Sequence, residues 1–350
     1  MDSAKRSVFV DLPLPIDEAT PVQILAVRDA AVIGREDLLP GRLLVADLDA
    51  QGKLTRSANS PILTSWGSGM FVPDAHRGQG IGRRLASHRE SLQPLRLSCG
   101  VSQMLLPIYR KLGWRDFEMQ RHVLLRSAAP VVERYLGSGI LSSLGTAVGN
   151  VALVLPKVLL GRRIDKRTRG LVIERTTAFP DDCRSALEEP RATASTERSG
   201  PIIDWMLGHR FVSDPRAKQG LAIVRNGDTG KGLGYILTKT RFHERASHRG
   251  FRNVLLGSLQ DWMSFAGSGL DFETLALCAM AELVRDGVSG IEICVPPQEN
   301  ARALRGLGFV RLGAQHFLFS AAPDSPLAAK HFSDPAAWWF RPADGDNVFV

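Results

Sequence analysis

Residues 70–85 read MFVPDAHRGQGIGRRL, and this stretch decides the fold. A short apolar run leads into a loop with glycines at 78, 80 and 82, and then into a helical pattern. The first N–H groups of a helix have no internal partner, and the helix dipole adds partial positive charge there. Glycine lets a ligand approach the backbone closely because it has no Cβ. We therefore predict a strand–loop–helix unit whose loop binds a pyrophosphate.

The pattern on both sides of this loop extends the unit into a domain. Ile81, Leu85 and Leu92 fall on one face of the helix, with arginines opposite. A strand is expected at 96–101, a short helix at 105–112 ended by Gly113, and a closing strand at 123–126. Before residue 70, short apolar stretches separated by turn signals predict strands around one early helix. The first domain is therefore expected to cover residues 1–128.

The loop resembles one family of phosphate-binding loops better than others. No Lys-Ser/Thr pair follows the glycines, so the loop is not of the Walker type, and no acidic residue ends a following strand as in dinucleotide folds. Arg77, Gly80 and Gly82 fit R/Q-x-x-G-x-G/A, which resembles motif A of the GCN5-related N-acetyltransferases (GNAT). Residues 109–114, YRKLGW, resemble the Y-x-x-x-G-F helix end of that family, with Trp114 in place of the usual Phe. The resemblance covers about residues 20–128.

This resemblance implies an α+β fold with a mixed, strongly bent sheet flanked by helices. The fourth and fifth strands would splay apart and admit acetyl-CoA, and Tyr109 would protonate the departing thiolate of coenzyme A. No metal ligand is implied. The residues expected to bind the cofactor lie on the strand end, the loop and the first helical turn: Met70, Phe71, Val72, Arg77, Gly78, Gln79, Gly80, Ile81, Gly82 and Arg83.

A general base is missing from its usual place. Members of the family often carry an acidic residue on the fourth strand, whereas residues 65–69 here read SWGSG. Asp47, Glu118 and His122 are other candidates in this domain. An amine that arrives neutral, or that loses its proton through ordered water, would need no such residue.

Residues 201–350 repeat the order of the first domain. A hairpin is expected over 221–238, a helix over 272–284, a strand over 291–295, a helix over 300–307 and a strand over 317–319. Residues 300–309, NARALRGLGF, resemble the second helix signature of the family, but no R-x-x-G-x-G precedes the 272–284 helix. We therefore expect a degenerate GNAT-like domain that serves as a substrate-binding wall or an interface.

Residues 129–200 are expected to form a helical and basic linker. Residues 135–156 carry no formal charge, and Lys157, Arg162, Arg163, Lys166, Arg167, Arg169 and Arg175 follow with two acidic residues among them. Three interpretations stay open. The apolar stretch is an ordinary buried or surface helix, an interfacial helix held to anionic lipid by the basic cluster, or a membrane span.

Composition limits the class of protein. The net charge of +8 and the 44% hydrophobic content indicate a folded globular protein. The four cysteines form no C-x-x-C pair, which disfavours zinc ribbons and disulfide frameworks. The N-terminal residues lack a secretory pattern, so a cytoplasmic location is expected, with peripheral membrane contact through 135–175 as an option. Aromatic residues do not interleave the basic run, which argues against nucleic-acid binding.

These observations predict an acetyl-CoA-dependent N-acyltransferase that acetylates a primary amine of a small molecule by direct attack. An amino sugar or a sugar-lipid precursor is the favoured acceptor, because the tail at 338–346, WWFRPADGD, resembles segments of bacterial tandem acetyltransferase-like proteins of polysaccharide synthesis. Asp344 and Asp346 there either bind sugar hydroxyls or form an Asp-Gly-Asp turn after a packed aromatic tail. The alternatives are a non-catalytic acyl-CoA-binding scaffold and a protein or peptide N-acetyltransferase. The oligomeric state stays open.

Overall fold

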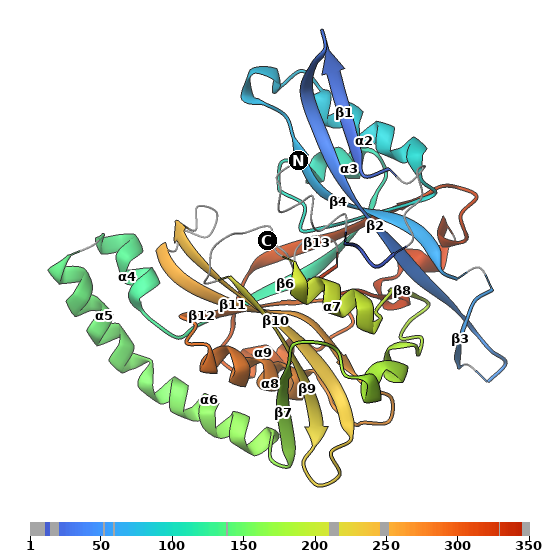
Figure 1. Ribbon diagram of the computed structural model, residues 1–350. Coiled ribbons are helices and arrows are strands. Elements are labelled where there is room, and N and C mark those ends of the chain that lie inside the picture. The colour runs from blue at the N-terminus through green and yellow to red at the C-terminus, as the bar shows by residue number, and fades with distance from the viewer. Residues whose placement is uncertain are drawn as a thin grey trace.

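The computed structural model describes residues 11–14, 21–51, 53–58, 60–137, 139–209, 217–245, 252–328 and 330–344. Within these ranges, fourteen strands form one mixed sheet with helices packed against it (Figure 1). Twelve of them run in the order β14-β8-β2-β4-β5-β13-β6-β12-β11-β10-β9-β7, and β1 and β3 pair with β2. The predicted fold class, a mixed sheet flanked by helices, is confirmed.

The N-terminal half is built on the long strand β2 (Ala31–Leu48), which pairs with β1, β3, β4 and β8. The sequence predicted one helix before residue 70. The described residues of that stretch form strands and contain no helix, because pairing along β2 overrides local preference. The helix predicted after the glycine loop is present as α2, and it connects the parallel strands β4 and β5. The remaining elements of this half are β1 (Gln23–Arg28), β3 (Leu54–Arg56), β4 (Ile62–Phe71), η1 (Asp74–His76), α2 (Ile81–Leu92), β5 (Leu95–Cys99), α3 (Leu106–Lys111) and β6 (Arg115–Leu125).

The middle segment, predicted as a linker, also contributes to the sheet. Its strand β7 (Leu171–Thr176) pairs with β9, and β8 (Ala194–Thr196) pairs with β2. The helices are α4 (Ala129–Leu136), α5 (Ile140–Ala152), α6 (Val154–Arg167), η2 (Asp181–Leu187) and α7 (Gly200–Gly208). In the described chain, no single helix passes the length and hydropathy test for a membrane span; α5 and α6 pass it only as a pair bent by 43°.

The C-terminal half repeats the arrangement of the first. The antiparallel hairpin β9–β10 is followed by β11, and α8 connects β11 to the parallel strand β12, as α2 connects β4 to β5. The predicted helices and strands are present, but the sequence missed β11. The elements are β9 (Lys218–Asn226), β10 (Gly232–Arg245), β11 (Arg252–Ser264), α8 (Phe272–Arg285), β12 (Gly290–Val295), α9 (Arg302–Gly306), β13 (Val310–Ala321), η3 (Pro326–Ala328), η4 (Lys330–Ser333), η5 (Pro335–Ala337) and β14 (Trp338–Trp339).

The two halves share their last long strands. β13, from the end of the chain, lies between β5 and β6, and β6 pairs with β12 of the second half. Backbone hydrogen bonds therefore run without a break from one half to the other, which the division into 1–128, 129–200 and 201–350 did not anticipate.

Aromatic side chains fill the core at this junction. The rings of Phe317 and Phe340 stack with centroids 4.2 Å apart, and Phe319 and Trp338 lie 4.5 Å apart. Phe117 of β6 also contacts this group, which joins residues from both ends of the chain. Such a core ties the C-terminal tail to the first half.

Buried charges fix the same tail. The guanidinium of Arg198 lies 2.5 Å from Asp261 and also binds Asp344, and all three side chains are at most 3% exposed. Asp344 also accepts a hydrogen bond from Thr196 at 2.8 Å. The sugar-binding role predicted for Asp344 is therefore not supported, since its carboxylate is buried and paired, and Asp346 lies outside the described residues.

Replacing Arg198 by Met should lower the free energy of unfolding by about 3–5 kcal/mol, because Asp261 and Asp344 would be left buried without their cation. Arg311→Met is the control, since Arg311 pairs with Glu118 at the surface, where both side chains are about half exposed. The control should cost at most about 1 kcal/mol. Urea unfolding would measure both, and equal losses would contradict a structural role for the buried network.

Candidate active site

The site lies where β4 and β5 separate. Their parallel pairing covers only three residue pairs and ends at Gly67 and Ser98. Directly after it, β4 carries a bulge, because Gly67 pairs with Leu38 but Gly69 pairs with Asp37, which leaves Ser68 as the extra residue. Bulges bend a strand and disrupt its pairing. A cavity of about 330 Å³ opens between the two strands, as the resemblance implied.

Arg89 of α2 occupies the point of separation. Its guanidinium donates to the carbonyl of Ser65 in β4 at 2.8 Å and to that of Leu97 in β5 at 2.6 Å. It also donates to Glu36 Oε1 at 3.1 Å, and its side chain is 0% exposed. One buried cation therefore bridges three strands of the sheet. Gly67 leaves the room for it, since a Cβ there would lie 2.6 Å from Arg89 Nη1.

Tyr109 and Glu36 meet in the cavity wall. The Tyr109 hydroxyl donates to Glu36 Oε1 at 3.2 Å, and both residues line the cavity. Glu36 Oε2 is buried and has no hydrogen-bond partner in the described structure. The Tyr109 ring packs against Trp114 with centroids 4.5 Å apart, so the residue at the position of the family's usual Phe supports the tyrosine.

Burial governs the protonation of both groups. Loss of hydration raises the pKa of the Glu36 carboxyl, and the nearby Arg89 charge and the Tyr109 hydrogen bond offset only part of this rise. Burial also raises the pKa of Tyr109, and the negative charge of Glu36 adds to that effect. Tyr109 therefore keeps its proton at neutral pH, while Glu36 becomes a stronger base than an ordinary carboxylate.

The glycine loop presents an uncapped helix end. Gly80 is the N-cap of α2, with φ 73° in the left-handed region, and Gly78 has φ 77°. No side chain caps the helix, so the N–H groups of the first turn, around Gly82 and Arg83, have neither an internal nor a side-chain acceptor. Nothing lies within 4 Å of a Cβ built on Gly78 or Gly80, so the space in front of the loop is open.

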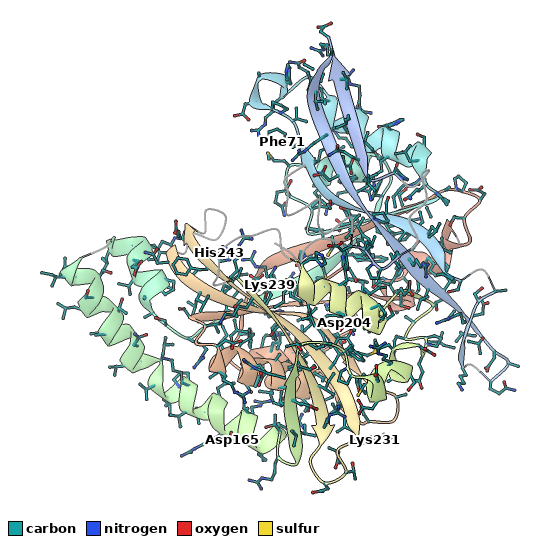
Figure 2. The ribbon with its side chains drawn as sticks, in the orientation of Figure 1. Phe71, Asp165, Asp204, Lys231, Lys239 and His243 are labelled. Atoms are coloured by element: carbon teal, nitrogen blue, oxygen red, sulfur yellow. The ribbon has the colours of Figure 1, made fainter. Side chains whose placement is uncertain are left out.

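The other predicted cofactor residues surround this loop, with one in the cavity. Met70 lines the cavity. Arg77 is exposed and binds Asp74 at 2.9 Å, and Gln79 accepts a hydrogen bond from Arg28. Phe71, Val72, Ile81 and Arg83 adjoin the loop, with Ile81 buried beneath it and the Phe71 and Arg83 side chains exposed (Figure 2 labels Phe71).

Sequence reasoning missed Glu36. The residue lies on β2 inside the run IGREDLL, between the charged residues Arg35 and Asp37, so the sequence gives no sign that its side chain is buried. Its 1% exposure and its place beside Tyr109 result from the pairing of β2 with β4 and from the contacts with Arg89 and Tyr109. Of the candidates named from sequence, Asp47 is exposed, Glu118 binds Arg311 and His122 is buried on β6; none of the three lines the cavity.

The second half lacks an equivalent helix end. Asp271 caps α8, and its carboxylate accepts from the N–H of Thr274 at 2.8 Å. Asp271 also lies 3.3 Å from Arg167. A carboxylate therefore occupies the place where an anion would bind at α2. In the part of the chain that the structure describes, no group of three or more His, Cys, Asp or Glu side chains could hold a metal ion.

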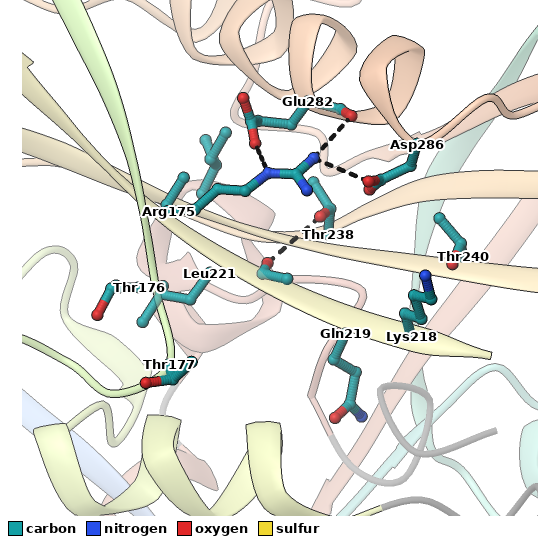
Figure 3. Close-up of a pocket in the computed structure, with 13 residues that line it drawn as sticks. Arg175, Thr176, Thr177, Lys218, Gln219, Leu221, Thr238, Thr240, Glu282 and Asp286 are labelled. Carbon is teal, nitrogen blue, oxygen red and sulfur yellow. Dashed lines mark hydrogen bonds and ion pairs between the residues drawn. The ribbon is translucent and has the colours of Figure 1, made fainter. Parts of the chain in front are cut away.

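A second cavity of about 470 Å³ lies over β7, β9, β10 and the end of α8 (Figure 3). Two cations, Arg175 and Lys218, line it. Arg175 binds Glu282 and lies 2.9 Å from Asp286, so acidic side chains already neutralise the charge of Arg175. None of the predicted site residues lines this cavity.

Gly67→Ala should lower the free energy of unfolding by about 1–3 kcal/mol, because its Cβ would press on Arg89 and on Glu36 Oε1. Gly161→Ala is the control, since a Cβ there in α6 meets nothing within 4 Å and should be neutral or stabilising by up to about 1 kcal/mol. Thermal unfolding of both variants would check this. An unperturbed Gly67→Ala protein would show that Arg89 does not fix the separation of the strands.

Known proteins were compared with the chain by sequence and by structure. No model of a protein family and no curated protein matches the sequence. A GCN5-related N-acetyltransferase from Anabaena variabilis aligns over 92% of this chain and 66% of its own, with a TM-score of 0.50 and 12% identity. The match therefore spans about two thirds of that protein.

Two further solved structures are similar at lower scores. A tandem GNAT protein from the clavulanic acid biosynthesis pathway covers 87% of this chain and 85% of its own, with a TM-score of 0.46 and 14% identity. The N-myristoyltransferase of Saccharomyces cerevisiae, solved with bound myristoyl-CoA, covers 84% and 73%, with a TM-score of 0.46 and 10% identity. Together with the separated β4 and β5 strands and the glycine loop before α2, the agreement with the Anabaena structure shows that this chain has the fold of the GCN5-related N-acetyltransferases.

Proposed function

We propose that this protein transfers an acetyl group from acetyl-CoA to a primary amine. The observation that carries the proposal is the cavity between β4 and β5, whose wall contains the buried pair Glu36 and Tyr109 and which lies next to the uncapped N-terminus of α2. The helix end suits a phosphate group, and the hydrogen-bonded carboxyl and hydroxyl suit proton transfer. Such a cavity fits a substrate that carries both a phosphate and a group that reacts with an amine.

The residues present fit coenzyme A. The N–H groups of the first turn of α2, with the open approach at Gly78 and Gly80, would hold its pyrophosphate. The exposed arginines 77, 83 and 84 add positive charge nearby. The edge of β4 at 69–71, beyond its last pair with β5, would pair with the pantetheine arm. The bound cofactor supplies the activated thioester.

Glu36 and Tyr109 would then move the proton between the two reactants. Glu36 Oε2, which has no partner, accepts a proton from the attacking amine, and Tyr109 donates its hydroxyl proton to the departing sulfur. A buried tyrosinate beside a carboxylate is strongly disfavoured, so Tyr109 can release its proton only when Glu36 has become protonated. The Glu36 carboxyl then rotates so that its new O–H faces the tyrosinate oxygen, and it returns a proton to Tyr109. The net change is one proton transferred from nitrogen to sulfur.

The acceptor that we propose is the amine of an amino sugar or of a sugar-linked lipid precursor. Ser68, Ser98 and Ser102 line the cavity, and serine hydroxyls suit hydrogen bonding to a hydroxylated acceptor. Peptide and protein amines are the competing acceptors. Release of free thiol from acetyl-CoA, measured with amino sugars and with peptides, would distinguish them. Coenzyme A binding without thiol release for any amine would favour a non-catalytic scaffold.

Gly80→Val should weaken coenzyme A binding at least about 100-fold, because a β-branched side chain strains the left-handed N-cap and fills the approach to the first-turn N–H groups. Gly230→Val is the matched control, since Gly230 also has a positive φ, 69°, and open space around it, but lies in the β9–β10 turn. Titration calorimetry with coenzyme A would measure both. Unchanged affinity in Gly80→Val would contradict this phosphate site.

Glu36→Gln should remove the acidic limb of the pH profile. In the wild type, kcat/KM should rise with pH up to a pKa above the ordinary glutamate range, because Glu36 acts deprotonated and burial raises its pKa.

Tyr109→Phe should lower kcat about 10²- to 10⁴-fold while coenzyme A affinity stays unchanged. Thiol release across pH would test both. An acidic limb that persists in Glu36→Gln would exclude this residue as the base.

A further inference from the structure

The helices α4, α5 and α6 form an arm along the outside of the sheet (Figure 1). On α5, small residues face α4 and the residue just before it. A Cβ on Gly149 would lie 2.5 Å from Cβ of Ala128, and one on Gly145 would lie 3.0 Å from Val132. Asn150 on this face accepts a hydrogen bond from the N–H of Ala128 at 2.9 Å. The small residues of α5 therefore pack inward, and its large apolar residues lie on the other face.

On α6, the inward face is fixed by both apolar packing and charge. Leu160 and Ile164 pack against the core of the second half. Arg163 binds Glu273 of α8 at 2.6 Å, and Arg167 binds Asp271. These contacts set the rotation of α6 about its axis, so the residues between them point away from the protein.

The outward face of both helices is a continuous apolar stripe. Its members follow one another at spacings of three or four residues and are all exposed; Leu144 is 60%, Val148 71% and Leu155 65% exposed. We call this the outer stripe: Ile140, Leu144, Val148, Val151, Leu155 and Leu159. An apolar patch of this length on a soluble surface marks an interaction site.

The same spacing continues into basic residues. Arg162, Lys166 and Arg169 follow Leu159 at steps of three, four and three, and all three are exposed. None of them has an ion-pair partner among the described residues, in contrast to Arg163 and Arg167 on the inward face. Asp165 is the one acidic residue of α6, and it is exposed beside them near the end of the helix (Figure 2).

We propose that the outer stripe docks on an anionic lipid surface, with the apolar side chains among the acyl chains and the basic residues against the headgroups. Charge complementarity selects this occupant. A second copy of the chain would bring further unpaired basic residues to the contact and only Asp165 to balance them. The arm lies on the bilayer and does not cross it, because α6 is bound along its inward face by Glu273 and the second core.

Vesicle flotation with the full-length protein tests the proposal. The wild type should float with vesicles of phosphatidylcholine and phosphatidylglycerol at low salt, and should be released by high salt or by omission of phosphatidylglycerol. Arg162→Gln and Lys166→Gln should each weaken binding about fivefold. Lys53→Gln and Arg56→Gln, which remove exposed charges on the β2–β3 hairpin far from the arm in sequence, should leave binding unchanged.

A second pair of variants tests the apolar part. Leu155→Gln should weaken binding about tenfold, whereas Leu48→Gln, at a residue with the same 65% exposure on β2, should have no effect. Both should unfold at the wild-type temperature. The proposal would be overturned if the wild type failed to bind anionic vesicles or bound neutral ones equally well. A dimer that Leu155→Gln dissociates in sedimentation would also overturn it, and would assign the outer stripe to a second copy of the chain.

Discussion

The guanidinium of Arg89 is the interaction on which the site depends. A parallel pair of strands normally stays paired along its length, and leaving backbone groups of β4 and β5 unpaired in the interior would be costly. Arg89 satisfies one carbonyl from each strand at the last point where they pair. Its charge also keeps the Glu36 carboxylate in the protein interior, where an unpaired carboxylate would be unfavourable. The opening between the strands and the buried Glu36–Tyr109 pair therefore depend on the same guanidinium.

The two halves show how the same arrangement can gain or lose a ligand site. Each has a helix connecting two parallel strands, but Gly80 leaves the end of α2 open, whereas Asp271 closes the end of α8 with its own carboxylate. Asp271 satisfies the same orphan N–H groups that an anion would bind. The two halves thus share this arrangement, but only α8 has a side-chain cap at its first turn.

The sequence predicts those features of the fold and of the candidate site that depend on residues close together in the chain. The α2 helix, its glycine loop and Tyr109 carry local signals, because a left-handed N-cap and a helical apolar face are properties of consecutive residues. Glu36 carries no such signal, since its position arises only from β2–β4 pairing, which brings it beside Met70, 34 residues along the chain, and from contact with α2 and α3. The insertion of β13 between β5 and β6 was equally invisible, because strand order in a sheet is decided by tertiary pairing. The orientation of α5 required the contacts of Gly149, which periodicity alone does not give.

The position of β13 has a consequence for the order in which the protein can be completed. A ribosome makes residues 310–321 long after β5 and β6, yet this strand fills the gap between them in the first half. Until it arrives, the facing edges of β5 and β6 stay open near the cavity between β4 and β5 and could pair with the wrong partner. The N-terminal half therefore cannot complete its own part of the sheet during translation until β13 has been made.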